Sequence, residues 1–384
     1  MPHYVQRGQI PRKRHTRFHR PDGRLYTEQL LGTRGFTGIS SLLYHRVPPT
    51  QALRFGQAIS VQPETVPEQA LRHHHLRTAA ITPHGDPITG RTPLLVNDDV
   101  ALGICCPTEP MSCFYKNADG DELLFIHEGT GRLETMFGTL HYTEGDYLII
   151  PRGTIYRIVP ESTQTRMLVI EASSTIEVPR RYRNEYGQML EHAPYCERDI
   201  RVPEYMEPCD ETGEFEVRIK ARQRITPYFY AHHPFDVVGW DGYLYPWAFS
   251  IHDFEPITGS LHMPPPIHQT FEAHNFVVCS FCPRMLDYHP DAIVVPYNHS
   301  NLESDEVLYY VNDRFGSRRG IEVGSITLHP AGLPHGPQPG AVEASQGARR
   351  TEELAVMVDT FRPLHLTRAA QALDDPQYPY SWIP

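Results

Sequence analysis

Short apolar runs, each bounded by glycine, proline, asparagine or aspartate, recur through the middle and the end of the chain. Such runs are typical of β-strands, and their number favours antiparallel sheets that close into sandwiches or barrels. Strands are predicted for residues 123–126, 147–150, 166–170, 276–281, 292–295, 307–311 and 354–358. Helical periodicity is scarce, and short helices are predicted only for residues 69–79, 179–190 and 366–373.

The chain also repeats itself weakly, with one copy in the middle and a second near the end. Each copy has a polar turn, an Asp-Glu pair, an apolar strand, a glycine-rich connection, a short β run and a Pro-x-Gly element. Glu122 precedes Pro151 by 29 residues, and Glu306 precedes Pro330 by 24. This is the two-motif layout of a cupin barrel, present twice. The predicted fold is therefore an all-β bicupin, with two double-stranded β-helix (jelly-roll) barrels and few short helices.

The repeats predict the domain order. Residues 1–100 are expected to form an N-terminal arm whose strands pack on the first barrel. Residues 101–230 are expected to form that barrel, and residues 231–384 a second, catalytic barrel with a tail pinned by Trp382. The 36 prolines and 27 glycines fit this division, because they favour short strands joined by turns over long helices.

The second copy carries a candidate metal site. His299 and Glu306 are seven residues apart across a turn, and His335 follows in a Leu-Pro-His-Gly-Pro run. Neighbouring strands of a jelly roll converge on the barrel interior, so two histidines and one carboxylate can share one face of a metal. Such a facial triad leaves positions open and favours Fe(II). Asp305 is an alternative carboxylate, since only one of two adjacent strand residues points inward.

The first copy lacks this set. Lys116 and Asn117 stand near the position of the first histidine, and Tyr156 stands where the second copy has His335. Neither lysine nor tyrosine suits Fe(II) in this setting. The first barrel is therefore predicted to be metal-free and structural.

Charge and cysteine content narrow the classes of partner and compartment. The formal net charge of −11 argues against nucleic acid or an anionic membrane, and the basic residues within 7–20 are expected to be a solvated arm or an oligomer contact. Neither a membrane-spanning run nor a secretory signal is recognised. Seven cysteines, with Cys105 beside Cys106, suit no disulfide framework and indicate the cytoplasm. Cys279 and Cys282 lie in an apolar run and are expected to be buried thiols.

At these residues the sequence resembles the homogentisate 1,2-dioxygenase family over most of the chain. The similar motifs are HPFDVVGWDG at 233–242, YNHSN at 297–301, GSITLH at 324–329 and PHGP at 334–337. The resemblance implies that His299, Glu306 and His335 are iron ligands. It also implies that His329 is a second active-site histidine and that His268 is the catalytic acid/base.

The resemblance further implies an activity and its partners. The expected reaction is Fe(II)-dependent cleavage of the homogentisate ring by O2 to maleylacetoacetate, in tyrosine and phenylalanine catabolism. Family members form trimers and hexamers, so a homo-oligomer is expected. Three alternatives stay open: cleavage of another hydroquinone such as gentisate, a non-catalytic metal-binding cupin, and a zinc or manganese isomerase.

Some roles also stay open. His262 and His274 compete with His268 for the acid/base role, and His329 could instead orient a metal ligand. The substrate carboxylate needs an anchor, and nearby candidates are Arg314, Arg318 and Arg319, which could equally be exposed loop charges. The triplet His73, His74 and His75 is expected to be an exposed arm rather than a metal site.

Overall fold

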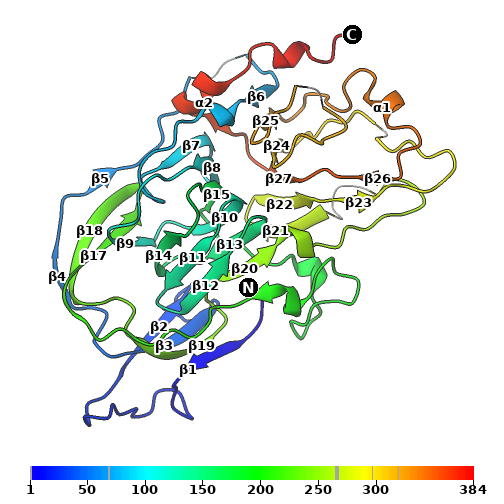
Figure 1. Ribbon diagram of the computed structural model, residues 1–384. Coiled ribbons are helices and arrows are strands. Elements are labelled where there is room, and N and C mark those ends of the chain that lie inside the picture. The colour runs from blue at the N-terminus through cyan, green and yellow to red at the C-terminus, as the bar shows by residue number, and fades with distance from the viewer. Residues whose placement is uncertain (1, 68–69, 264–267, 296, 319) are drawn as a thin grey trace.

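The computed structural model describes residues 2–67, 70–263, 268–295, 297–318 and 320–384, and the described chain is almost entirely β-structure (Figure 1). One eight-stranded sheet runs through its centre. In spatial order its strands are β16 (Ile200–Arg201), β20 (Trp247–Ser250), β13 (Asp146–Ile150), β10 (Asp121–Glu128), β15 (Arg166–Ala172), β8 (Val100–Cys105), β7 (Arg91–Val96) and β28 (His365–Leu366). This central sheet supplies a wall to the first barrel and supports the second.

Two further large sheets complete the two barrels. The first barrel is closed by β12 (Gly138–Tyr142), β11 (Gly131–Thr135), β14 (Ile155–Pro160), β9 (Phe114–Asn117), β17 (Thr212–Ala221), β18 (Arg224–His232) and β4 (Ala52–Phe55), with β5 (Ile59–Ser60) beside β18. The C-terminal sheet contains β21 (Gln269–Ala273), β22 (Phe276–Phe281), β27 (Ala355–Thr360), β24 (Asp305–Tyr310), β25 (Ile326–His329) and β6 (His74–Leu76). The fold is thus a bicupin, as predicted.

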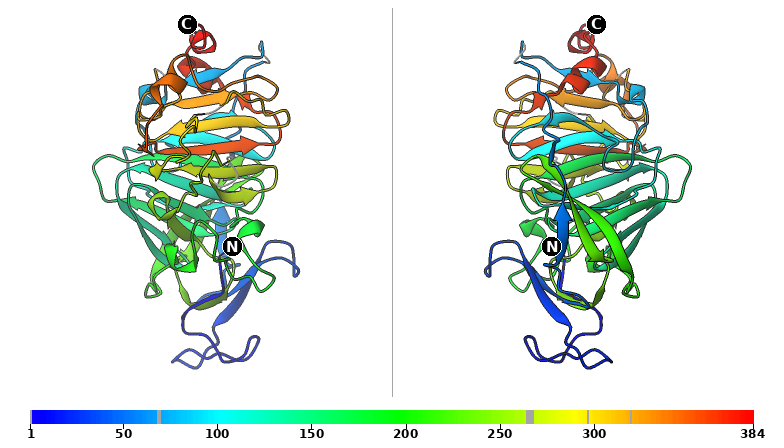
Figure 2. Two further views of the ribbon diagram at one scale, coloured as in Figure 1. Left: turned by 90° about the vertical axis from the view of Figure 1, so that its right-hand side faces the viewer. Right: turned by 90° about the vertical axis from the view of Figure 1, so that its left-hand side faces the viewer.

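Smaller elements complete the chain. The N-terminal sheet has the order β1 (Val5–Gly8), β19 (Val237–Gly242), β3 (Ser40–His45) and β2 (Thr27–Gly32), and β23 (Arg284–Met285) pairs with β26 (Arg350–Thr351). The two short helices are α1 (Ala341–Ala344) and α2 (Arg368–Leu373). In Figure 2 the C-terminal strands, yellow to red, stack at the end of the molecule opposite the blue N-terminal strands. No helix in the described part of the chain is long and apolar enough to cross a membrane.

The central sheet is buried on both faces. Leu124 and Leu148 point into the first barrel, where they pack with Tyr156 and other apolar side chains. Their neighbours Leu123 and Phe125 point the other way and join the larger core between the central and C-terminal sheets. Successive strand residues face opposite sides, so burial on both faces explains the unbroken apolar run of β10.

Each copy of the Asp-Glu pair uses its aspartate as a structural clamp. Asp121 accepts backbone N–H groups from Arg152 (2.9 Å) and Ile176 (3.1 Å). Asp305 accepts the corresponding pair from Ala331 and Leu364, both at 2.8 Å. The aspartates thus tie down the loops next to their strands, which leaves the glutamates to face the barrel interiors.

Most strand predictions are confirmed, and the exceptions have clear causes. Residues 292–295 form no strand, residues 180–182 form only a 3₁₀ turn within the helix predicted for 179–190, and α2 falls within the third predicted helix. The helix predicted for 69–79, of which residue 69 lies outside the described residues, is instead β6 followed by a 3₁₀ turn at 78–80. In this segment, backbone pairing with β25 outweighs the local preference for helix.

The prediction of an exposed histidine triplet was wrong. His73, His74 and His75 are all buried, because β6 pairs with β25 and the C-terminal tail packs against all three rings. The side chain of His74 contacts Asp374 at 2.8 Å, and His75 Nε2 lies 2.8 Å from the hydroxyl of Ser325. Cys279 and Cys282, by contrast, are buried free thiols, as predicted.

The domain bounds at residues 100 and 230 stay a prediction. Strand pairing ties the predicted parts together, since β6 joins the C-terminal sheet and β20 extends the central sheet. Trp382 pins the tail, as predicted: its indole N–H donates to the carbonyl of Gly336 at 3.0 Å.

Candidate metal centre

Three side chains converge inside the second barrel, and backbone pairing explains their convergence. His299 and His335 form an isolated antiparallel bridge, and each donates its backbone N–H to the other's carbonyl at 2.8 Å. Their rings consequently lie 4.3 Å apart. Glu306 faces them from β24, on the same side of the strand as the interior residue Leu308. Gly336 permits the close approach, because a Cβ there would overlap Asn298.

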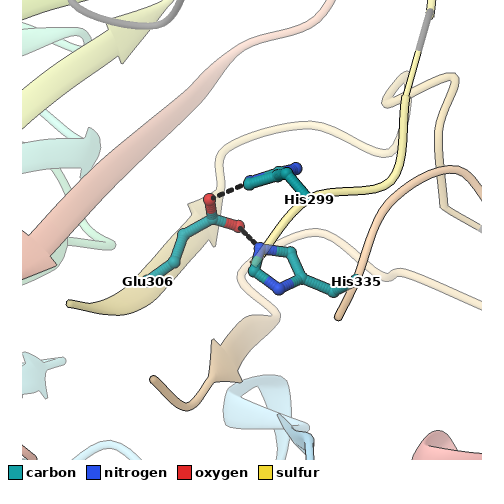
Figure 3. Close-up of side chains that lie close together, drawn as sticks. All are labelled: His299, Glu306 and His335. Atoms are coloured by element: carbon teal, nitrogen blue, oxygen red, sulfur yellow. Dashed lines mark hydrogen bonds and ion pairs between the residues drawn. The ribbon is translucent and has the colours of Figure 1, made fainter. Parts of the chain in front are cut away.

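The three side chains form a compact donor set (Figure 3). One ligand atom from each of His299, Glu306 and His335 lies within 4.8 Å of the others. Nε2 of His299 is 3.4 Å from Oε2 of Glu306, and Nε2 of His335 is 3.3 Å from Oε1. Among the described residues this is the one histidine, cysteine and carboxylate group with metal-binding geometry.

Hydrogen bonding prepares this set for a cation. Nδ1 of His335 lies 3.1 Å from the carbonyl of Leu333, so Nδ1 carries the proton and the lone pair of Nε2 faces the site. That Nε2 is buried without a hydrogen-bond partner. Burial alone would raise the pKa of Glu306, but the contacts with the surrounding histidines lower it well below its usual range. Two imidazoles and a carboxylate therefore fit a divalent metal, and the ligand assignment stays a prediction.

His329 lies directly behind Glu306. Its Nδ1 is 2.8 Å from Oε1 of Glu306, and its Nε2 is 3.0 Å from the hydroxyl of Tyr378. Burial lowers the pKa of His329 to about 3, so the ring is neutral and donates from Nδ1 to the carboxylate. Nε2 then accepts from the Tyr378 hydroxyl. Both ring nitrogens are engaged, which fits the alternative of an orienting neighbour of the carboxylate, and the role of His329 stays a prediction.

A cavity of about 440 Å³ opens beside the metal-binding side chains. Apolar walls come from side chains of the barrel interior and of the loop after β24, namely Phe281, Leu308, Phe315 and Met357. The polar lining includes His262, Arg284 and Arg318, together with His299 and Glu306. Of the other candidate anchors, Arg314 lines the same cavity, and Arg319 lies outside the described residues. The cavity thus has room for a small aromatic molecule next to the donor set.

His268 is not among the residues that line this cavity. It precedes β21, is buried, and stacks on Phe281 with ring centroids 4.7 Å apart. His262 does line the cavity, and its ring packs 5.3 Å from that of Tyr297. His274 is exposed, and its backbone N–H donates to Ser174. The acid/base role of His268 stays a prediction, with His262 better placed to reach a bound ligand.

The first barrel has an internal cation at the corresponding position. Tyr156 pairs with Tyr115 as His335 pairs with His299, so Tyr115, rather than Lys116 or Asn117, occupies the place of the first ligand.

The guanidinium of Arg91 donates to the buried carboxylate of Glu122 and, at 3.0 Å, to the hydroxyl of Tyr156. A positive charge from the chain itself thus stands where the second barrel presents its donor set. This is the physical reason to expect no metal in the first barrel.

Two residues at the site were missed in the sequence. Asp359 on β27 pairs across from Glu306 and follows Met357, so it faces the barrel interior, where burial raises its pKa to about 7. The sequence did offer a signal for Asp359, since it is the one charged residue in the apolar strand AVMVDT. Tyr378 had no such signal, because it reaches His329 from the C-terminal tail.

Comparisons with known proteins agree with this architecture. A family model described as homogentisate 1,2-dioxygenase N-terminal matches residues 86–251. A Saccharolobus solfataricus protein named "Putative dioxygenase" is 43% identical over 382 residues, which cover 99% of this chain and 98% of that protein. Homogentisate 1,2-dioxygenase of Bradyrhizobium diazoefficiens is 27% identical over 67% of this chain, and the match spans 59% of that enzyme.

Among solved structures, Bacillus subtilis oxalate decarboxylase matches 77% of this chain and 78% of its own, with 9% identity and a TM-score of 0.34, which is too low to support any argument about function. The relatives are decisive, since one of them is similar over nearly its full length. The resemblance seen in the motifs is confirmed: the chain belongs to the homogentisate 1,2-dioxygenase family of ring-opening dioxygenases, as a divergent member.

Proposed function

We propose that this protein is an Fe(II)-dependent dioxygenase that opens the ring of homogentisate with O2 and forms maleylacetoacetate. The observation that carries the proposal is the convergence of His299, Glu306 and His335 beside a cavity of aromatic size. Two histidines and one carboxylate are the donor set that non-haem Fe(II) oxygenases use, and they leave positions open for ligands. The homogentisate dioxygenases among the relatives supply the choice of substrate.

The chain's own residues prepare the site for this chemistry. Bound Fe(II) would supply open positions for a ring hydroxyl and O2 and carry electrons between them. Glu306 is held as an anion by His329, which is itself held by Tyr378. Both atoms of O2 end in the product, so the reaction needs no further reductant.

A histidine must take the proton of the ring hydroxyl. His262 lines the cavity, and burial lowers its pKa, which favours a neutral, proton-accepting ring. We therefore assign the base to His262 in preference to His268. Replacing each by glutamine tests the assignment: His262→Gln should retain iron and lose turnover, whereas His268→Gln should retain both. The opposite pattern would return the role to His268.

Oxygen uptake tests the proposed reaction. The Fe(II)-loaded protein is expected to consume O2 with homogentisate, and the metal-free protein is expected to consume none. Uptake with gentisate but not homogentisate would change the substrate. Metal binding without uptake on any hydroquinone would indicate a non-catalytic cupin. We also propose a cytoplasmic homo-oligomer, a trimer or hexamer, which light scattering of the purified protein would test.

A further inference from the structure

The first barrel has a cavity of its own. Its volume is about 750 Å³, compared with about 440 Å³ beside the metal-binding side chains. Its apolar walls include Ile88, Val169 and Ile225. The two cavities share no lining residue, so the one in the first barrel is a separate space of a size that binds small molecules.

The buried charges at this cavity compensate one another. Arg91 donates to the carboxylates of Glu122 and Glu171, and Lys220 donates to Glu171. These two cations and two anions leave no net charge in the buried part of the wall. The other acidic and basic residues of the lining are exposed, namely Asp98 and His365. A ligand with a net charge would lack a buried counter-charge, so the cavity favours an uncharged molecule.

Two side chains keep hydrogen-bond donors for a ligand. Tyr115 lines the cavity and is only 1% exposed, yet its hydroxyl makes no hydrogen bond with any described residue. The neighbouring Tyr156, by contrast, donates to Glu122 and accepts from Arg91. The ammonium of Lys220 has three N–H donors and one acceptor among the described residues, Glu171. Free donors therefore face this cavity from Tyr115 and Lys220.

The matching acceptor must come from the ligand. The carboxylate of Glu171 already accepts from both cations, and that of Glu122 accepts from Arg91, Tyr156 and Asn117. An alcohol or a primary amide would bring a donor of its own and find these buried acceptors engaged. A ketone oxygen only accepts, and it therefore matches what the wall offers.

We propose that the first barrel binds a small uncharged ketone, whose oxygen accepts a hydrogen bond from Tyr115 and whose apolar body packs against Ile88, Val169 and Ile225. Lys220 supplies a second donor at the same cavity. This binding site is distinct from the metal centre and does not depend on the reaction proposed for the second barrel. The metal-free barrel then has a ligand of its own in addition to its structural role.

Calorimetry with acetophenone tests this site, on the protein with Fe(II) present and without oxygen. The wild type should bind acetophenone about tenfold more tightly than ethylbenzene, which has a similar shape and no acceptor, and more tightly than the anion benzoate. Tyr115→Phe should weaken acetophenone binding about two- to tenfold, the range of one hydrogen bond, and leave ethylbenzene binding unchanged. Tyr142→Phe is the matched control and should change neither, because the Tyr142 hydroxyl is also buried without a partner but does not line the cavity.

A second variant fills the cavity. Ala101 lines it, so Ala101→Phe should abolish acetophenone binding, with the circular dichroism spectrum and the iron content unchanged. Because the Tyr115 hydroxyl bonds no described residue, Tyr115→Phe should keep the wild-type fold and decides the matter even if Ala101→Phe does not fold. Acetophenone binding that is unchanged in Tyr115→Phe would place the probe elsewhere and overturn the inference. So would a wild type that binds no acetophenone, or one that prefers benzoate.

Discussion

Replacement of Arg91 by methionine tests the idea that an internal cation stabilises the first barrel. The guanidinium donates to Glu122, to Glu171 at 2.9 Å and to Tyr156 at 3.0 Å. Methionine retains much of the volume and removes the charge. The side chain of Glu122 is fully buried, so the variant leaves an uncompensated charge in the barrel. Breaking a buried pair in this way costs about 3–5 kcal/mol.

The assay is urea unfolding of the metal-free protein, followed by tryptophan fluorescence and far-ultraviolet circular dichroism. A second variant, Arg91→Met with Glu122→Gln, removes the stranded charge and should recover at least half of the lost stability. Arg132→Met, at partly exposed ion pairs with Glu134 and Glu161, is the control and should cost about 1 kcal/mol or less. Loss of under about 1 kcal/mol in Arg91→Met, or no recovery in the double variant, would refute the reasoning.

Three further outcomes follow from the structure. Glu306→Gln should lose metal affinity with little loss of stability. Asp305→Asn should retain the metal site and lower the free energy of unfolding by about 1–3 kcal/mol, because Asp305 accepts hydrogen bonds from two backbone N–H groups. Metal titration measures the first effect, and urea unfolding measures the second. Burial lowers the pKa of His127 from 6.5 to about 4, so unfolding takes up a proton below pH 6.5. This group alone should therefore lower the stability by up to about 3 kcal/mol between pH 6.5 and 4. His127→Gln should remove that share of the slope and leave the share of the other buried histidines, His73 and His268, whose pKa values burial also lowers. Tyr378→Phe should weaken iron binding several-fold in a metal competition assay, since it frees the ring that orients Glu306, and unchanged affinity would show that His329 needs no such support.

The sequence predicted the bicupin because short apolar runs recur along it and because the Asp-Glu motif is present twice. The period of two along β24 also contained the answer to the choice between Asp305 and Glu306. Once the strand is buried on both faces, one of the pair must face the loops and the other the barrel. Alternation alone does not say which of Asp305 and Glu306 faces the barrel. The structure answers this, because Asp305 accepts hydrogen bonds from two backbone N–H groups of the loops.

The residue of the first copy that corresponds to His299 could have been found from the sequence. Counting seven residues back from Glu122 reaches Tyr115, the same spacing that joins His299 to Glu306. Arg91 was beyond such counting, because it comes from a strand outside the repeated motif.

Contacts between distant segments account for the remaining failures. The histidine triplet at 73–75 is buried because β6 pairs with β25, some 250 residues later in the chain, and because the C-terminal tail packs against it. Tyr378 reaches the site from the tail, and His262 and His268 both lie near prolines in the sequence. No periodicity specifies which of those two rings faces the cavity. Such pairings are set by tertiary packing, which local pattern does not encode.

The most direct test of the account measures iron content and oxygen uptake together, on the wild type and on His335→Ala. The account predicts iron binding and O2 consumption with homogentisate in the wild type, and loss of both in the variant, because two ligands hold Fe(II) poorly. A His335→Ala protein with full iron content and full turnover would contradict it.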